Sequence, residues 1–340
     1  MVTIYDIAKK AGVSSATVSK VLNGYADISF KTAERVKKIC EVEGYRPSSV
    51  ARGLATKKSS TIGIFFTDHL NSGFRHPFLQ DVLASFKEVV GRSGYDLIFF
   101  TDDHPDNHRM GYLERSSYRH VEGLFLLGIS RMDQHLQRLV ECKVPCVAVD
   151  LDLIGPRSSF FASDNRGGAI KAVDYLAEMG HKEIAFISDI YSTFPGKERL
   201  IGFREGMQKN HLTIYSDRIY NSDFSEQGGY EACFQLLENP ALPTAIFCGC
   251  DLIALGVMKA LHEKGVRVPE DVSVIGFDDL ELLRYIKPGL TTIGQNKELL
   301  GKSAGVELLK MIENPNYYPN TSCFIETELV IRETVKDVRQ

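Results

Sequence analysis

A run of short polar side chains with one lysine lies between Thr3 and Gly24. Serine, threonine and asparagine can hydrogen-bond to base edges and phosphates, and lysine supplies positive charge for phosphates. Because these side chains are short, a helix that carries them can lie close to the base edges of the DNA major groove. The segment therefore predicts a DNA-reading surface. Its candidate residues are Thr3, Ser14, Ser15, Ala16, Thr17, Ser19, Lys20 and Asn23.

Short helices must position these side chains. The pattern predicts helices over residues 4–11 and 15–22, broken at Gly12 and with Ser14 capping the second. An amphipathic stretch over 31–43 predicts a third. This is a helix-turn-helix arrangement, in which capping is an alternative role for Thr3 and several of the other hydroxyls.

The charge of the chain is distributed unevenly. Residues 1–60 carry 11 basic and 5 acidic residues, although the whole 340-residue chain has a net charge of −4. The remainder is therefore strongly acidic. A small basic head on a large acidic body is expected when one part binds phosphate and the other stays away from it.

The head segment, together with residues 44–55, resembles the DNA-binding head of the lac-repressor/galactose-repressor family of bacterial transcription regulators. The resemblance implies a helix-turn-helix domain at 1–47, a hinge helix and linker at 48–60, and an effector-binding, dimerising core at 61–340. In the reading helix, Lys20 stands where the family usually has arginine, which removes bidentate recognition of guanine. The resemblance extends the DNA-binding set to the hinge residues Val50, Ala51 and Leu54, with Leu54 as a minor-groove wedge. A packing role in the linker is the alternative for Leu54.

Short apolar runs alternate with helical stretches after residue 61, which predicts an α/β core of two doubly wound parallel-sheet lobes. Asp164 at a helix start marks the second lobe. The core resembles periplasmic sugar-binding proteins, and this implies three crossings between lobes. We expect the first lobe to hold about 61–161 and 290–322, and the second about 162–289 and 323–340.

Polar residues at strand ends and helix starts predict an effector site in the crevice between the lobes. By family resemblance these are Asp150, Arg199 and Asp278, with Phe224 as an aromatic cover. Carboxylates and an arginine fork suit vicinal sugar hydroxyls. Arg199 is expected to open a helix. Asp150 as a loop cap and Phe224 as a core residue are the structural alternatives.

One position departs from the family pattern, because Cys250 occupies the place of an asparagine that commonly binds effector. The ligand is then unusual, or is held by other groups, or is no longer bound tightly. The loop over 68–78 offers replacements in Phe74, Arg75 and His76, the last two suited to a carboxylate or phosphate. A solvated loop is the alternative.

The sequence favours an effector-controlled repressor that binds a pseudo-palindromic operator as a homodimer and is released by a small sugar or sugar acid. A regulator controlled by a protein partner, or by no ligand, is the alternative. An enzyme is disfavoured because phosphate loops, nucleophile elbows and metal motifs are missing from the sequence. We also expect reduced cysteines, no metal or cofactor, no membrane partner, and a cytoplasmic bacterial protein that joins the nucleoid when bound to DNA.

Overall fold

The computed structural model describes residues 2–46, 58–66, 76–101, 110–141, 143–239, 241–319 and 322–339. The chain forms two compact units, Met1–Ser60 and Thr61–Gln340. The expected hinge helix, with Val50, Ala51 and Leu54, lies outside the described residues. The effector candidates Phe74 and Arg75 lie outside them as well.

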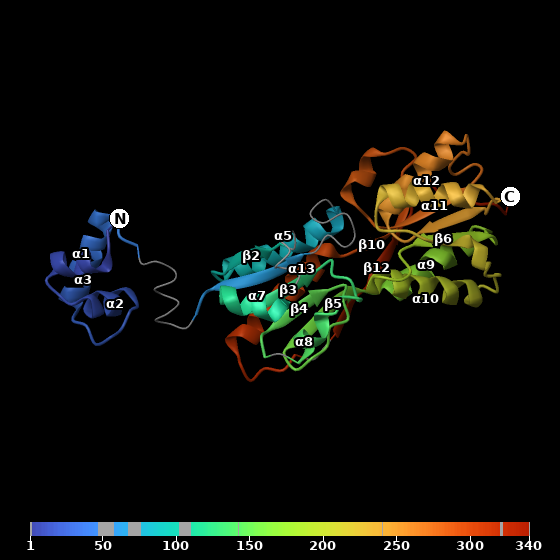
Figure 1. Cartoon of the computed structure of the whole chain (residues 1–340). Coiled ribbons are helices and arrows are strands. Elements are labelled where there is room, and N and C mark those ends of the chain that lie inside the picture. The colour runs from blue at the N-terminus through green and yellow to red at the C-terminus, as the bar shows by residue number, and fades with distance from the viewer. Residues whose placement is uncertain are drawn as a thin grey trace. The chain divides into compact units, whose positions relative to one another are not determined.

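The first unit contains the three expected helices, α1 (Ile4–Ala11), α2 (Ser15–Leu22) and α3 (Phe30–Glu43) (Figure 1). Gly12 ends α1 in the left-handed conformation, with φ of 63°, which glycine adopts without steric cost. Apolar side chains from all three helices make a separate small core, including Ile7, Val18, Val21, Val36 and Cys40. This core lets the head hold its shape independently of the large unit.

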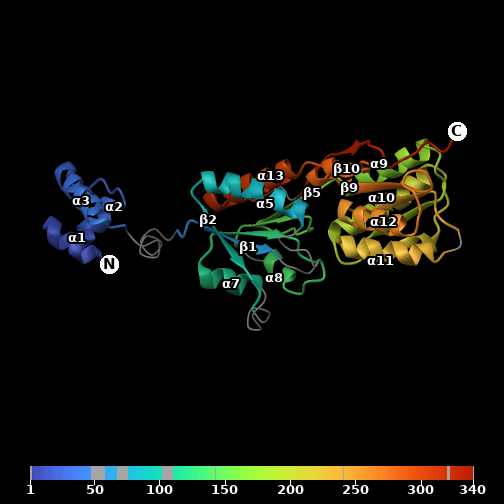
Figure 2. The ribbon, with the colours of Figure 1, turned by 90° about the horizontal axis from the view of Figure 1, so that it is seen from above.

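The first lobe of the large unit is built on a parallel sheet of order β11-β5-β4-β3-β1-β2. Its central strands are continuous apolar runs because helices cover both faces. Helices α5 (Pro77–Arg92) and α13 (Lys297–Glu313) pack together on one face, and α7 (Tyr112–Arg119) and α8 (Leu136–Val140) lie on the other (Figure 2). The strands are β1 (Thr61–Phe66), β2 (Asp96–Phe100), β3 (Gly123–Leu127), β4 (Cys146–Val149), β5 (Ser158–Ser163) and β11 (Ser322–Ile325).

The second lobe repeats this plan with the order β12-β10-β9-β8-β6-β7, in which only β12 runs antiparallel to its neighbour. Helix α9 (Asn165–Glu178) packs on α10 (Phe194–Lys209), and α11 (Glu226–Leu237) packs on α12 (Asp251–Glu263). The strands are β6 (Ile184–Ser188), β7 (Ile219–Asn221), β8 (Ala245–Cys248), β9 (Ser273–Asp278), β10 (Thr291–Gln295) and β12 (Thr327–Val330), and the 3-10 turns are η2 (Ser216–Arg218) and η3 (Glu281–Tyr285).

The expected return to the first lobe at Leu290 was wrong. Strand β10 stays in the second sheet, pairing with β9 and β12, and its side chains are buried there. The chain crosses after it, at Asn296, which caps α13. It then completes the first sheet with β11 and crosses again before β12. A short apolar run shows that a strand is present, but only pairing shows which sheet it joins.

The helix at Arg199 also begins earlier than expected. Thr193 caps α10 by accepting a hydrogen bond from Gly196, and Pro195 sits in the first turn, where its missing N–H costs nothing. Arg199 is therefore in the second turn and not at the helix start. None of the helices in the described parts of the chain is long and apolar enough to cross a membrane.

Candidate functional site

The predicted DNA-reading residues divide into helix caps and outward-facing side chains. Thr3 forms a capping box with Asp6, its hydroxyl donating to the carboxylate at 2.7 Å. Ser14 caps α2 by accepting from the Thr17 N–H at 3.1 Å. These hydroxyls already have structural roles, so capping accounts for Thr3 and Ser14 without DNA.

The side chains left for DNA lie on α2. Ala16 and Lys20 are exposed, while Ser15 and Ser19 are half-buried. The Lys20 ammonium pairs with Asp27 at 2.5 Å. Exposed ion pairs of this kind contribute little to stability, so the lysine can exchange its carboxylate for a phosphate. Asn23 contacts Ser19 at 3.4 Å at the end of the helix.

A buried pocket lies between the two lobes of the large unit. Its volume of about 50 Å³ is room for a few water molecules, since one needs roughly 10–15 Å³. Most of the lining is apolar, with a few polar groups that could fix a ligand's orientation. The lining residues from the first lobe are His76, Phe78, Leu79, Gly128, Ile129 and Asp150, and those from the second are Thr193, Pro195, Arg199, Phe224 and Asp278.

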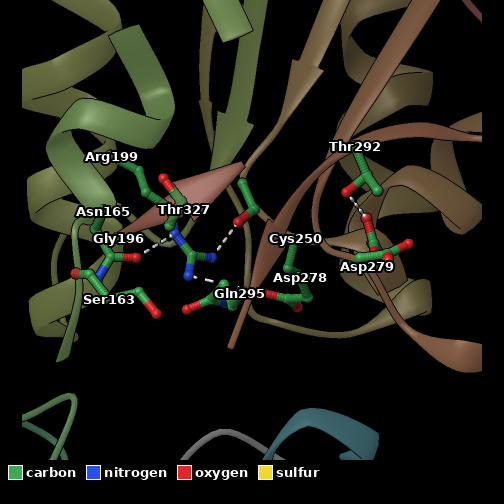
Figure 3. Close-up of polar contacts among 12 residues, drawn as sticks. Ser163, Asn165, Gly196, Arg199, Cys250, Asp278, Asp279, Thr292, Gln295 and Thr327 are labelled. Atoms are coloured by element: carbon green, nitrogen blue, oxygen red, sulfur yellow. Dashed lines mark hydrogen bonds and ion pairs between the residues drawn. The ribbon is translucent and has the colours of Figure 1, made fainter. Parts of the chain in front are cut away.

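Arg199 is the most constrained polar group of the pocket (Figure 3). Its Nε donates to Asn165 Oδ1 at 2.8 Å, and its Nη1 donates to the Gly249 carbonyl. The guanidinium lies 3.8 Å from the centre of the Phe277 ring, and its Nη2 is 3.6 Å from Asp278 Oδ1. Because the fork is held on several sides, it is oriented before any ligand arrives.

Asp278 ends β9 and shares this buried region with Asp251. Gln295 donates to Asp278 Oδ1 at 2.5 Å, and Lys297 donates to the Asp278 backbone carbonyl. Asp251 accepts from the Leu280 N–H at 2.9 Å and from the hydroxyl of Thr292. Burial raises the pKa of both carboxyls, because removing them from water disfavours their charged forms.

Asp150 and His76 bring unpaired polar atoms from the first lobe. Asp150 Oδ1 and His76 Nδ1 are buried with no hydrogen-bond partner among the described residues. Burial raises the pKa of Asp150 to about 7. Burial, assisted by the Arg199 charge, lowers the pKa of His76 to about 4, so the imidazole is neutral near pH 7. Both atoms are suited to a ligand that supplies the missing hydrogen bonds.

Asp150→Asn is expected to stabilise the protein in a pH-dependent way. The carboxyl has a pKa of about 7 in the folded protein and about 3.9 when unfolded. Stability is therefore lost as pH rises from about 4 to 7, because the unfolded chain gives up this proton first. At pH 8 the variant should gain about 2–4 kcal/mol in free energy of unfolding, and at pH 4 almost none.

Asparagine also suits the backbone at this position, where φ is 56°. Urea unfolding of both proteins at the two pH values provides the measurement. An equal gain at pH 4 and pH 8 would show that the effect comes from packing and not from titration.

Five of the predicted effector residues line the pocket: His76, Asp150, Arg199, Phe224 and Asp278. The Phe224 ring is buried, with its centre 5.9 Å from the Arg199 guanidinium carbon. Cys250 is not among the lining residues; it caps α12, accepting from the Ile253 N–H at 3.4 Å.

Sequence reasoning missed the residues that hold the charged groups in place. Asn165 and Gln295 orient Arg199 and Asp278, and Thr193 and Pro195 shape the pocket wall. Asn165 lies two residues after the end of β5, so recognition of that strand would have placed it at the carboxyl edge of a sheet. The strand was missed because Ser158–Ser163 mixes serines with its apolar residues.

A helix-turn-helix head joined to a two-lobed α/β core with a buried pocket defines a class of protein, the ligand-responsive transcription regulators. The chain matches the family model "Bacterial regulatory proteins, lacI family" over residues 3–48 and "Periplasmic binding protein-like domain" over residues 173–335.

Relatives match over the whole chain. It is 33% identical over 345 residues to the HTH-type transcriptional repressor PurR of Glaesserella parasuis, and 32% identical over 340 residues to the ribose operon repressor of Haemophilus influenzae. Both alignments cover 100% of each chain. The protein therefore belongs to the lacI family and is a transcriptional repressor of that family.

Solved structures agree in fold. The lac repressor dimer bound to operator and the anti-inducer ONPF aligns with a TM-score of 0.84 at 28% identity, covering 98% of this chain and 99% of that one. A complex of the transcriptional regulator CelR with cellobiose aligns with a TM-score of 0.74 at 29% identity, covering 98% and 100%. The predicted fold class, a helical head on two parallel-sheet lobes, is confirmed.

Proposed function

We propose that this repressor binds a pseudo-palindromic operator as a homodimer and is released by a small sugar or sugar acid bound between its lobes. We infer the ligand class from one observation. The fixed Arg199 guanidinium lies in the same pocket as the buried carboxyls of Asp150 and Asp278. A ring with vicinal hydroxyls can donate to the carboxyls and accept from the arginine. The apolar face of such a ring can rest on Phe224.

The names of the relatives guide the order in which sugars are tested. The pocket of about 50 Å³ has room for a few water molecules, so the lobes must move apart to admit any sugar. The name of the ribose operon repressor is in keeping with a monosaccharide, whereas the CelR complex contains cellobiose. We therefore place pentoses, hexoses and their uronic acids first among candidate effectors.

DNA reading is assigned in this proposal to α2. Ser15, Ala16 and Lys20 reach base edges, while Thr17, Ser19 and Asn23 serve as phosphate partners. Thr3 and Ser14 cap α1 and α2, and in this proposal they also contact the DNA backbone. The proposal assigns minor-groove contacts to Val50 and Ala51 and the wedge to Leu54, which requires this segment from both subunits of a dimer to meet on the DNA. A repressor acting on DNA in this way works in the cytoplasm.

Effector binding can weaken operator binding only as far as it favours the released conformation. A shift from 1:99 to 99:1 requires roughly 5.5 kcal/mol of differential affinity. The test measures operator binding of the full-length protein by fluorescence anisotropy in the presence of each member of a panel of pentoses, hexoses, uronic acids and nucleobases. One sugar or sugar acid is expected to release the DNA at sub-millimolar concentration.

Two outcomes would overturn the ligand class. Release by a planar nucleobase alone would mean that Phe224 stacks on a heterocycle and that the carboxyls bind ring nitrogens. The absence of any response, together with an unchanged unfolding temperature in every ligand, would favour the alternative, control by a protein partner.

A further inference from the structure

Two residues that line the pocket and one behind them bring metal-binding atoms together. They are the His76 imidazole, the Cys250 thiol and the Asp278 carboxylate, whose ligand atoms all lie within 4.8 Å of one another. All three residues are buried. His76 precedes α5 in the first lobe, whereas Cys250 caps α12 and Asp278 ends β9 in the second. The cluster therefore spans the junction of the two lobes.

Two residues of this cluster have atoms with few contacts, whereas the Asp278 carboxylate would bind a metal in addition to its contacts with Gln295 and Arg199. His76 is 4% exposed, and its Nδ1 has no hydrogen-bond partner among the described residues. Cys250 Sγ accepts one long contact from the Ile253 N–H at 3.4 Å. A buried imidazole with an unpartnered ring nitrogen is a common metal ligand.

The charges around the cluster favour an added cation. Asp150 and Asp278 line the same pocket, and Asp251 is buried at the start of α12. These three carboxyls stand against two cations, the Arg199 guanidinium, 3.6 Å from Asp278 Oδ1, and the Lys297 ammonium, which donates to the Asp278 carbonyl. A buried region with more acidic groups than cations favours an added positive charge.

The donor set identifies the metal by its chemistry. Thiolate and imidazole together select borderline and soft ions, and a carboxylate completes a set that suits Zn²⁺ in tetrahedral geometry. Ligand atoms around such an ion are roughly 3.4–3.6 Å apart, given bonds of about 2.0–2.3 Å. Since the ligand atoms lie up to 4.8 Å apart, the side chains must converge by up to about 1.2–1.4 Å to bind one ion.

We propose that His76, Cys250 and Asp278 form a zinc site that joins the two lobes, with a fourth position open to water or to an oxygen of the effector. Binding converts the Cys250 thiol to a thiolate and releases its proton to solvent. Because each lobe supplies ligands, Zn²⁺ favours the conformation in which His76 meets the other two residues. The site goes beyond the proposed sugar response and requires neither sugar nor DNA.

The first test measures Zn²⁺ bound to full-length, metal-free protein by equilibrium dialysis. Wild type should bind one Zn²⁺ per chain, and Cys250→Ser should weaken its binding at least 100-fold. Serine at this position keeps a capping oxygen for α12 while removing the thiolate. The matched control is Cys323→Ser, which removes an exposed thiol in β11 outside the cluster and should bind as wild type does.

The second test uses Co²⁺ as a spectroscopic probe of the thiolate. Wild type and Cys323→Ser should show a thiolate-to-cobalt charge-transfer band, and Cys250→Ser should not. His76→Asn should keep the band but bind the metal at least tenfold more weakly. If thermal unfolding shows that metal-free Cys250→Ser is not folded, the metal affinity of His76→Asn serves as the test of the site instead.

Two results would overturn the zinc site. One is wild-type protein that binds no Zn²⁺ at micromolar concentration, and the other is a folded Cys250→Ser that retains the metal and the cobalt band. Both tests omit sugar and DNA. A protein that binds Zn²⁺ but responds to no sugar would therefore contradict the proposed effector and leave the metal site standing.

Discussion

Arg199→Ala is expected to abolish release from the operator by the effector while leaving operator binding of the unliganded protein unchanged. The guanidinium is the fixed donor in the pocket, held by Asn165 and Gly249. A charge-assisted hydrogen bond contributes about 1.5–3 kcal/mol, so loss of two such bonds should weaken effector binding by a hundredfold or more. The measurement is a titration of the repressor–operator complex with the effector that releases wild type.

The same substitution should lower stability, because it leaves Asp278 buried without its cation. Removing one partner of a buried ion pair typically costs about 3–5 kcal/mol. The matched control is Arg204→Ala, the same change at an exposed position of the same helix, which should leave both stability and release unchanged. A folded Arg199→Ala protein that still releases DNA at the wild-type effector concentration would contradict the assignment.

A fragment of residues 1–57 is expected to bind the operator at least a hundredfold more weakly than the full-length protein. The head has its own apolar core and forms a separate compact unit, so the fragment should fold. It carries a single reading helix, however, whereas a dimer presents two linked heads. Linking two binding modules raises affinity about 10²–10⁴-fold through effective concentration.

The salt dependence of binding provides a second readout for the fragment. The slope of log affinity against log salt is proportional to the number of phosphates neutralised, about 0.9 per phosphate. A single head should therefore give about half the slope of the dimer. Equal affinity and equal slope would contradict the dimer, as would light scattering that showed a monomeric full-length protein bound to the operator.

The head could be predicted closely from sequence because its structure depends on local signals. Capping hydroxyls at Thr3 and Ser14 and the left-handed Gly12 mark the helix ends, and each acts within a few residues of itself. Much of the alternation of strands and helices in the core was also readable, since many of its buried parallel strands are continuous apolar runs, although β5 with its serines was not. The family resemblance then supplied the two lobes and the position of the pocket.

Other features depend on which distant segments pair. The short β10 segment, Thr-Thr-Ile-Gly-Gln, fits either sheet equally well, and only its hydrogen bonds to β9 and β12 place it in the second lobe. Because α10 begins earlier than predicted, Arg199 lies in the second turn and not at the N-terminus of the helix. From there it reaches Asn165 and Asp278. These features follow from tertiary packing, which local patterns in the sequence do not specify.

The sequence by itself therefore determined many of the elements of this protein, the basic head, the family, and five of the eleven residues that line the pocket. The tertiary structure alone decided the shared environment of His76, Cys250 and Asp278, which the sequence analysis had not treated as metal ligands. No spacing rule links these residues, because they lie on different elements of two lobes. These residues become buried and interact electrostatically only when the two lobes come together. Such interactions depend on distance in space, and the order of residues along the chain does not reveal that distance.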